Sequence, residues 1–485
     1  MSRTVQLRTA AWYGDDRLAL TFPDDWQVTA WRPVLPAPLI DQQISAALER
    51  PVGQPPIRRL AQGKRRPLII VDDLTRPTPA GRVLPLVLRQ LGDAGIPADQ
   101  VRIMLGTGTH TPPSPEAVAK KIGQHAASSC RVLLHDDTRN LASVGRTSFG
   151  SPIIVNREVL ASDLLLGIGG VYPQHSVGFG GGSKLALGVL GKRSIISLHY
   201  GHPSMDGSYR VANDFRRDLD EMAARIGLRT TITMHVDADR QVVRMVSGDH
   251  FRYYHEAAAF SFEAYRAPLP GDADLVVSNS YPIDVSLTFM RSKGMTPLMH
   301  ARPGASRILV CACSEGVGHH GLFPFVNGPR FGRQLHMARI ARVAPSAIPT
   351  RAADFLVRRV RSAIRGAHSA ARAGLRPEED GQARAGPTWL YVPGRRALDL
   401  PPRIPGMVAS GSWPDILHRV RLEQRTRKSL KVVVYACAPL QVLAASGSPT
   451  KRSAAAGVLL ERPVDTALRA TLGGERRGAS DTIGQ

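Results

Sequence analysis

Three short apolar runs of this chain are each followed by polar residues of types that can bind or activate a small anion. The runs and the segments after them are residues 68–71 before DDLTR at 72–76, 101–105 before GTGTH at 106–110, and 164–168 before GGVYPQHSVGFGGGSK at 169–184. Asp72 could orient a ligand hydroxyl, and Arg76 could bind a carboxylate or a phosphate. His110 could accept a proton near neutral pH. As the alternative, Asp72 and Thr75 could cap the helix that follows them. If these groups bind a ligand, the three segments are expected to form the walls of one pocket.

The glycine-rich segment GFGGGSK at 178–184 departs from both standard nucleotide-binding motifs. A P-loop needs glycine before its lysine and Ser or Thr after it, but Ser183 and Leu185 occupy these places. The dinucleotide fingerprint fails as well, because Ser183 stands where its last glycine belongs. What remains is a loop that allows close approach of a ligand and delivers Lys184, which can hold an anion or act as a nucleophile when desolvated. The alternative is an ordinary flexible turn.

Four histidines fall in or beside these segments: His110, His175, His199 and His202. Neutral imidazole is a good ligand for nickel, zinc or iron and a good proton acceptor. Each of them alone could be a structural histidine with satisfied hydrogen bonds. Their grouping favours a role in metal binding or acid–base chemistry.

The apolar runs are bounded by Gly, Pro or Asp and followed by helical patterns, which is typical of buried parallel strands. Ligands of such sheets bind beyond the carboxyl ends of the strands. A second alternation follows APLPG at 267–271, with apolar runs at 274–277, 308–313, 389–392 and 432–435. The fold class is therefore α/β, with two doubly wound α/β domains and the active site in the cleft between them. We expect an N-terminal domain at 1–267, a C-terminal domain at 268–450 and a basic tail at 451–485. Trp12 and its neighbours predict a small β-hairpin before the first domain's strands.

Composition limits the partners and the compartment. The 485 residues include 63 basic and 40 acidic side chains, a net charge of +23, and four cysteines without a CxxC pair. No window approaches the roughly 18 consecutive apolar residues of a membrane span, so we expect a cytoplasmic protein without one. The positive charge could attract nucleic acid, but no zinc-finger or RNP motif is found, and nucleic acid is not the expected partner. Residues 355–372 predict a basic amphipathic helix. The sequence leaves the oligomeric state open.

Five motifs together resemble the nickel-dependent lactate racemase family over residues 12–318. They are VDDLTRPTP at 71–79, LGTGTH at 105–110, GVYPQHSVGFGGGSKLALG at 170–188, LHYGH at 198–202 and SNSYPIDVSLTFMRSKG at 278–294. The resemblance implies two α/β domains with the active site between them. It also implies a nickel pincer nucleotide, which is a pyridinium-3,5-bisthiocarboxylic acid mononucleotide whose sulfur arms hold nickel. The maturation proteins that build this cofactor become expected partners.

The resemblance implies a role for each matching residue. Lys184 matches the lysine that tethers the cofactor through a thioamide. His199 matches the nickel ligand, with His202 as the alternative. His110 matches one of two catalytic bases. The remaining matches are Asp72, Thr75 and Arg76, which line the cofactor and substrate, and Lys293, which binds the substrate carboxylate.

The family chemistry removes a hydride from an α-hydroxy carbon while a histidine takes the hydroxyl proton, and the return to either face needs a second base. Where the family has histidine after the proline of the third motif, this chain has Gln174, and His175 comes next. We expect His175 to be the second base, with Gln174 left open. Phe289-Met290 replaces an aromatic-Gln pair of the family, which predicts a substrate larger or differently polar than lactate.

These observations predict a racemase or epimerase of a 2-hydroxy acid or related hydroxy-carboxylate. Loss of the second base would leave a one-sided oxidoreductase or lyase in the same pocket. A non-catalytic nucleotide or nucleic-acid binding protein is the third hypothesis, and it predicts strongly salt-dependent binding to DNA or RNA.

Overall fold

The computed structural model describes residues 3–174, 176–202, 209–289, 294–318, 320, 387–394, 400, 404 and 406–444. The expected second base His175, the expected carboxylate ligand Lys293, the helix predicted at 355–372 and the basic tail at 451–485 lie outside the described residues. The described residues all belong to one compact unit. Among the described residues, no helix is both long enough and apolar enough to cross a membrane.

The first sheet has six strands in the order β13-β12-β9-β4-β5-β6. Its strands are β4 (Pro67–Asp72), β5 (Arg102–Gly106), β6 (Arg131–Leu134), β9 (Leu164–Gly170), β12 (Thr230–Val236) and β13 (Val242–Asp249). All neighbours are parallel except the edge strand β13, which pairs antiparallel with β12. From β4 the chain builds outward to β6 and then returns through β9 on the other side, so the strand order reverses between β4 and β9. The predicted doubly wound sheet is confirmed.

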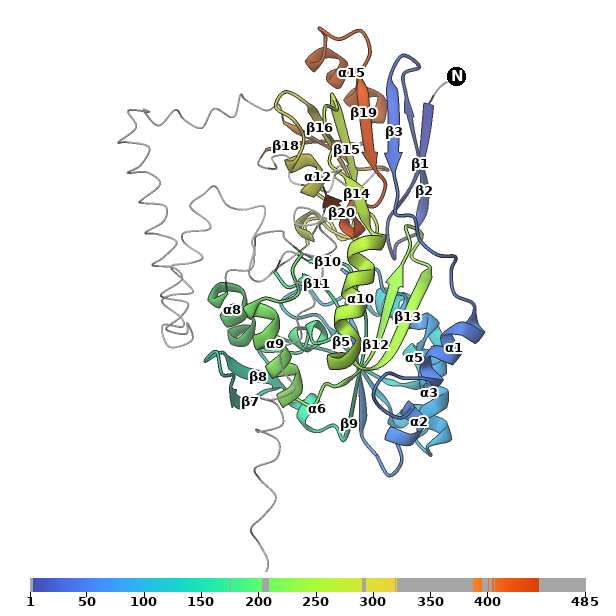
Figure 1. Ribbon diagram of the computed structural model, residues 1–485, viewed down its shortest axis with the longest axis vertical. Helices are drawn as coiled ribbons and strands as arrows, with labels where there is room; N and C mark the ends of the chain where they lie inside the picture. The colour runs from blue at the N-terminus through green and yellow to red at the C-terminus, as the bar shows by residue number, and fades with distance from the viewer. Residues whose placement is uncertain are drawn as a thin grey trace, which may run out of the picture. The chain divides into compact units, whose positions relative to one another are not determined.

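Both faces of the first sheet are covered because its central strands are apolar on both sides. In β4, Ile69 and Val71 lie in one core, whereas Leu68 and Ile70 lie in the other. The helices up to residue 264 are α1 (Asp41–Glu49), α2 (Ile57–Leu60), α3 (Leu84–Asp93), α4 (Pro115–Ile122), α5 (Gln124–Ser129), α6 (Arg157–Leu160), α7 (Lys184–Leu187), α8 (Lys192–Gly201), α9 (Asp214–Arg225) and α10 (His250–Ala264). The long helix α10 packs on β12 and β13 (Figure 1).

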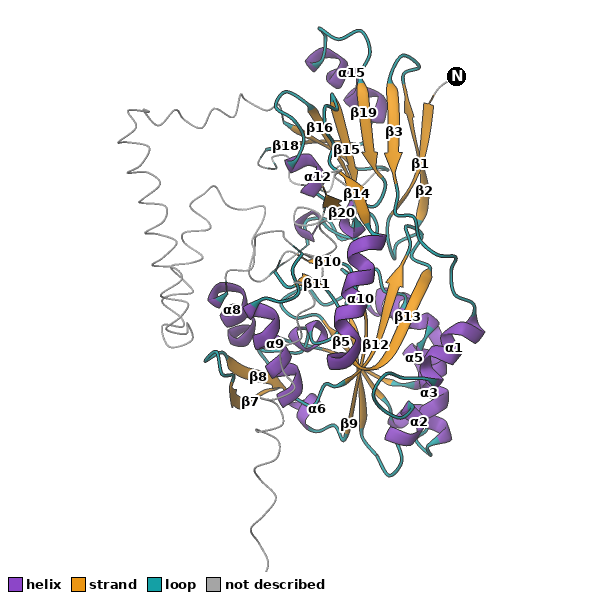
Figure 2. Cartoon of the chain, in the orientation of Figure 1, coloured by secondary structure: helices purple, strands orange, loops and turns teal. Residues whose placement is uncertain are grey.

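The second sheet is parallel throughout, in the order β18-β17-β16-β15-β19-β3. Its strands are β3 (Gln27–Trp31), β15 (Leu275–Asn279), β16 (Ser306–Val310), β17 (Thr388–Tyr391), β18 (Met407–Ser410) and β19 (Lys431–Tyr435), flanked by α12 (Thr296–Met299) and α15 (Trp413–Glu423). Figure 2 shows β16, β15, β19 and β3 side by side. The apolar runs expected as strands in this part of the chain are found in β15, β16, β17 and β19. At the end of β16, Cys311 and Cys313 are both buried, and their sulfurs lie 3.3 Å apart.

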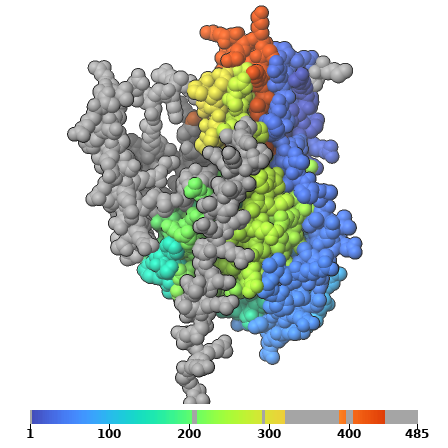
Figure 3. Space-filling model, viewed as in Figure 1, coloured from blue at the N-terminus to red at the C-terminus, as the bar shows by residue number. Residues whose placement is uncertain are grey.

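One strand pairs outside the domain to which the sequence analysis assigned its segment. Strand β3 comes from the segment assigned to the first domain, but it pairs with β19 at the edge of the second sheet. Figure 3 shows the same neighbourhood as N-terminal residues bordering C-terminal ones. Sequence grouping missed this pairing because the two strands are about 400 residues apart. The division at residues 267 and 450 stays a prediction.

Short elements complete the described chain. The predicted N-terminal hairpin is present as β1 (Arg3–Thr9) and β2 (Asp16–Phe22), with Trp12 in its turn. The other short pairs are β7 (Leu141–Arg146) with β8 (Pro152–Asn156), β10 (Pro173–Gln174) with β11 (Gly178–Phe179), and β14 (Arg266–Pro268) with β20 (Val442–Ala444). Short 3-10 turns lie at Ala80–Arg82, Ala98–Gln100 and Ala438–Leu440.

Candidate active site

The three polar segments meet because their strands are neighbours in the first sheet. Asp72 at the end of β4 pairs with Gly106 at the end of β5, and Val71 pairs with Ile168 near the end of β9. The loops after these strands therefore leave the sheet at one edge, beside the point where the strand order reverses. This is where ligands bind in doubly wound sheets. The three segments therefore share one edge of the sheet, and their forming the walls of one pocket stays a prediction.

The centre of the site is a hydrogen-bonded pair between His110 and Asp73. His110 Nδ1 lies 2.5 Å from Asp73 Oδ2, and both side chains are largely shielded from solvent. Burial by itself raises the pKa of Asp73, but His110, Arg76 and Thr75 outweigh it and lower this pKa to about 2. Asp73 is therefore ionised at neutral pH and keeps the proton of His110 on Nδ1. Burial lowers the pKa of His110, so the ring is neutral and its Nε2 can accept a proton.

Asp73 is a functional residue that the sequence interpretation missed, since the roles were given to its neighbours. Thr75 donates its hydroxyl to Asp73 (2.5 Å), so this hydroxyl supports the His110–Asp73 pair. The doubled aspartate was the available signal. Because side chains alternate along a strand, only one of two consecutive aspartates can face a given side.

Asp72 is enclosed by protein contacts. Its Oδ2 accepts hydrogen bonds from Thr78 Oγ1 (2.6 Å) and from the Gly170 N–H (3.2 Å), and its Oδ1 lies 2.7 Å from Lys121 Nζ. These contacts tie the loop after β4 to the end of β9 and to α4. They give Asp72 a structural function, and its contact with a cofactor stays a prediction.

Lys184 starts the short helix α7 at the end of a firmly held glycine-rich loop. Arg216 donates to the carbonyls of Phe179 (2.5 Å) and Gly181 (3.3 Å), and Tyr254 donates to those of Phe179 (2.8 Å) and Gly180 (3.0 Å). The alternative of an ordinary flexible turn is therefore wrong. A Cβ at Gly182 would lie 2.8 Å from the Tyr254 ring, so glycine is required there for close packing.

The electrostatic surroundings of Lys184 activate its amine. Burial and, to a smaller extent, the guanidinium groups of Arg76 and Arg216 together lower the pKa of Lys184 to about 7, against a weaker opposing effect of Asp73. Among the described residues, no carboxylate forms an ion pair with this amine. A lysine with this pKa is partly neutral at physiological pH and can act as a nucleophile.

His199, on α8, belongs to the same surroundings, whereas His202 does not. The Nδ1–H of His199 donates to the Ile195 carbonyl (2.8 Å), and in the neutral ring this leaves Nε2 with a lone pair. Burial lowers the pKa of His199 to about 3, and the nearby Lys184 and His110 contribute to this. His202 Nε2 instead bonds the buried carboxylate of Asp218 (2.7 Å). His199 is therefore the better placed of the two for a ligand at Lys184.

Two rings from the second half of the chain pack on His110. The ring centroid of Phe289 lies 4.5 Å from that of His110, and the ring centroid of His320 lies 5.0 Å away. Burial also lowers the pKa of His320 strongly, so its ring is neutral. His320 was not among the predicted site residues, although it follows β16 through a glycine-rich turn just as His110 follows β5.

Comparisons with known proteins agree with this arrangement. Residues 13–208 match the family described as the lactate racemase N-terminal domain. The chain is 26% identical over 292 residues to a lactate racemase of Lactiplantibacillus plantarum, covering 58% of this chain and 68% of that protein. It is 26% identical over 324 residues to a lactate racemase of Thermoanaerobacterium thermosaccharolyticum, covering 64% and 76% respectively. Residues 13–208 thus belong to the lactate racemase N-terminal domain family, and the chain is similar to lactate racemases over a longer stretch.

The fold agrees with this assignment. The structure of the lactate racemase apoprotein from Thermoanaerobacterium thermosaccharolyticum superposes with a TM-score of 0.64, covering 91% of this chain and 100% of that one at 20% identity. This likeness shows that the two proteins share a fold.

Segments far apart in the sequence meet beside Gln174. A small hollow is lined by Pro173, Gln174 and Tyr209 on one side and by Thr296, Ala438, Pro439 and Gln441 on the other. Gln174 is buried in β10, directly before the undescribed His175. Among the described residues, no group of three His, Cys, Asp or Glu side chains could hold a metal ion on its own.

Proposed function

We propose that this protein is a racemase or epimerase of a 2-hydroxy acid or related hydroxy-carboxylate, acting with a nickel pincer nucleotide carried by Lys184. The likeness to lactate racemases supports a racemase activity. The observation that carries the rest is the half-buried Lys184, which lies near His199 and Arg76 and has a pKa of about 7.

The residues present suit such a cofactor. The Lys184 amine would form the thioamide, His199 Nε2 would be the protein ligand of nickel, and Arg76 supplies a positive charge for an anionic group. Because residues 180–182 carry no side chains, the loop before Lys184 packs closely on its neighbours, and this packing sets the position of Lys184. When bound, the cofactor supplies the acceptor and donor of the hydride.

The protein's own groups would handle the proton and the orientation of the substrate. His110 Nε2 would take the proton of the substrate hydroxyl, and the ionised Asp73 would stabilise the imidazolium that results. Arg76 and Lys293 would hold the substrate carboxylate, and His175 would serve the opposite face of the planar ketone. Phe289 presents an aromatic edge without a hydroxyl beside His110, which supports a substrate other than lactate.

One observation favours a second candidate. Gln174 occupies the place of the family's second histidine and is buried in β10. If His175 does not reach the substrate, the site would act on one face only, as an oxidoreductase or lyase. Incubating each enantiomer of a processed substrate with wild type and with His175→Ala distinguishes the two, because a racemase reaches the same mixture from both enantiomers.

The deciding experiment is intact mass and nickel analysis of protein produced together with the cofactor-building enzymes. We expect an adduct of pincer-nucleotide mass and stoichiometric nickel in wild type and in Lys192→Ala, which removes a nearby lysine of α8. Both signals should be lost in Lys184→Ala. Absence of adduct and nickel from wild type, under conditions that load a known family member, would overturn the proposal.

A further inference from the structure

The turn of the N-terminal hairpin reaches loops of the second sheet. We call residues 10–15 the N-terminal strap. The backbone N–H groups of Ala10 and Ala11 donate to the carboxylate of Asp284 (2.8 and 3.0 Å), which is fully buried after β15. Tyr13 donates its hydroxyl to Glu315 (2.7 Å), in the turn after β16. One side of the strap is thus fixed to the loops that also carry Phe289 and His320.

The other side of the strap contacts the loop that holds Asp73. Trp12 is buried, and its Nε1–H donates to the carbonyl of Leu74 (2.9 Å) in the middle of residues 72–76. Two cations lie near the indole: Arg240 Cζ is 3.8 Å and Lys121 Nζ 4.8 Å from the ring centroid. Such contacts are attractive and restrict where the ring can lie.

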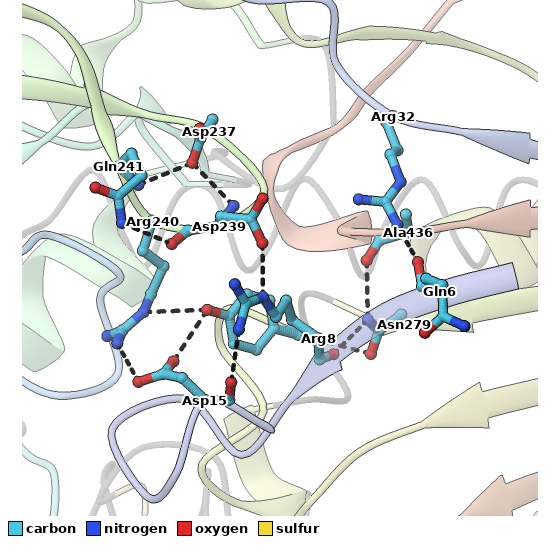
Figure 4. Close-up of polar contacts among 11 residues, drawn as sticks. Gln6, Arg8, Asp15, Arg32, Asp237, Asp239, Arg240, Gln241, Asn279 and Ala436 are labelled. Atoms are coloured by element: carbon cyan, nitrogen blue, oxygen red, sulfur yellow. Dashed lines mark hydrogen bonds and ion pairs between the residues drawn. The ribbon is translucent and has the colours of Figure 1, made fainter. Parts of the chain in front are cut away.

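Arg240 and Lys121 are themselves held. Arg240 comes from the turn between β12 and β13, where it pairs with Asp15 of the strap and donates to the Tyr281 hydroxyl (3.2 Å). Figure 4 shows Arg240 extending toward Asp15, beside the contact of Arg8 with Asp239. Lys121 is fully buried; its Nζ lies 2.7 Å from Asp72 and donates to the Arg76 carbonyl (3.0 Å).

Residues 72–76 are therefore held by contacts at three points. Lys121 holds the first and last residues of the loop, and Trp12 holds Leu74 between them. Asp73 lies within this held segment, and its carboxylate position fixes the tautomer of His110. A shift of the Leu74 carbonyl would move the neighbouring Asp73 relative to the imidazole.

We propose that Trp12 is a positioning residue of the active site. The Nε1–H of Trp12 fixes the position of residues 72–76, and thereby the position of Asp73 relative to His110. Because the strap is also bonded to loops of the second sheet, the position of those loops affects the acid–base pair. The catalytic meaning of this device rests on the proposed function, but the contact between Trp12 and the His110–Asp73 pair does not.

The test is Trp12→Phe, which keeps an aromatic ring near the two cations and removes the indole N–H together with the second ring. Trp413→Phe is the matched control, because Trp413 is similarly buried and donates its Nε1–H to a backbone carbonyl, that of Thr21 (2.8 Å), in the core of the second sheet. Protein labelled with 15N-histidine reports on the His110 Nδ1–H resonance, which is assigned by its loss in His110→Gln. No cofactor or substrate is required.

We expect the two variants to lose similar thermal stability, since each loses one indole-to-carbonyl hydrogen bond. Only Trp12→Phe should shift the Nδ1–H resonance upfield or broaden it, as the bond to Asp73 lengthens. An unchanged resonance in folded Trp12→Phe would overturn the proposal. Should that variant fail to fold, Arg240→Gln is the second variant. It removes the guanidinium near the indole ring and should shift the resonance in the same direction. An unchanged resonance there would overturn the proposal equally.

Because the readout comes from protein without cofactor, it separates two kinds of failure. A shifted resonance in a protein that never loads nickel would keep the positioning role of Trp12 and reject the proposed function. A loaded, active enzyme whose resonance is indifferent to Trp12→Phe would do the reverse.

Discussion

Replacing Lys184 by methionine is expected to stabilise the protein without its cofactor, since the fold keeps this amine where its charge is unfavourable. The pKa of Lys184 falls from its ordinary value of 10.5 to about 7 through burial and through Arg76 and Arg216. At pH 7 this fall corresponds to about 4 kcal/mol of lost free energy of unfolding. The side chain keeps some exposure to solvent, which screens its charge, so we expect a gain of about 2 kcal/mol in Lys184→Met.

The sign of the effect makes the prediction specific. Between pH 7 and 10.5 the unfolded lysine still holds a proton that the folded one has lost, so wild type gains stability as the pH rises through this range. Lys184→Met lacks this dependence. The advantage of the variant should therefore be largest below pH 7 and disappear above about pH 10.5.

Urea unfolding of both proteins across this pH range measures the difference directly, because other titrating groups contribute equally to the two. Lys192→Met, on the first turn of α8, serves as a control for the loss of a lysine. A variant that is less stable than wild type at pH 7, or a difference that does not change with pH, would refute the reasoning that Lys184 is held partly neutral by its surroundings.

Three further predictions concern the surroundings of this lysine. Asp73→Asn should lower the free energy of unfolding at neutral pH by about 2 kcal/mol, since the carboxyl pKa falls from 3.8 to about 2 on folding; urea titrations should show the gap closing as the pH drops from about 4 toward 2, and a constant gap would contradict it. His199→Ala should abolish nickel retention, whereas His202→Ala should mainly lower the melting temperature by removing the partner of Asp218; metal analysis showing full nickel in His199→Ala would reject this assignment. Gly182→Ala should cost about 1–3 kcal/mol more than Gly227→Ala: both have positive φ, but only the first would bring a Cβ against a ring, and equal unfolding curves would count against the tight packing of the loop.

Much of the fold could be predicted because its signals are local. The runs in β4, β5 and β9 are apolar on consecutive residues, as strands covered on both faces must be, and each ends at Gly or Asp. The helical pattern expected after the first apolar run is found in α3, which ends at Asp93, and Gly95 behind it has φ +84°. Strand β3 could not be placed in this way, since its partner β19 lies at the other end of the chain.

The candidate site likewise has some features that local sequence determines and others that depend on the tertiary structure. The sequence by itself determined which chemical groups are present and that the strand ends deliver them to one edge of the sheet: Lys184 after its glycines, and His110 after β5. Only the tertiary structure decided that Asp73 rather than Asp72 faces His110, and that His320 packs on the same ring. It also decided the pKa of Lys184, because burial and distant guanidinium groups set that value. Local periodicity specifies elements, whereas pairing, burial and electrostatic surroundings depend on residues that meet only when the chain has folded.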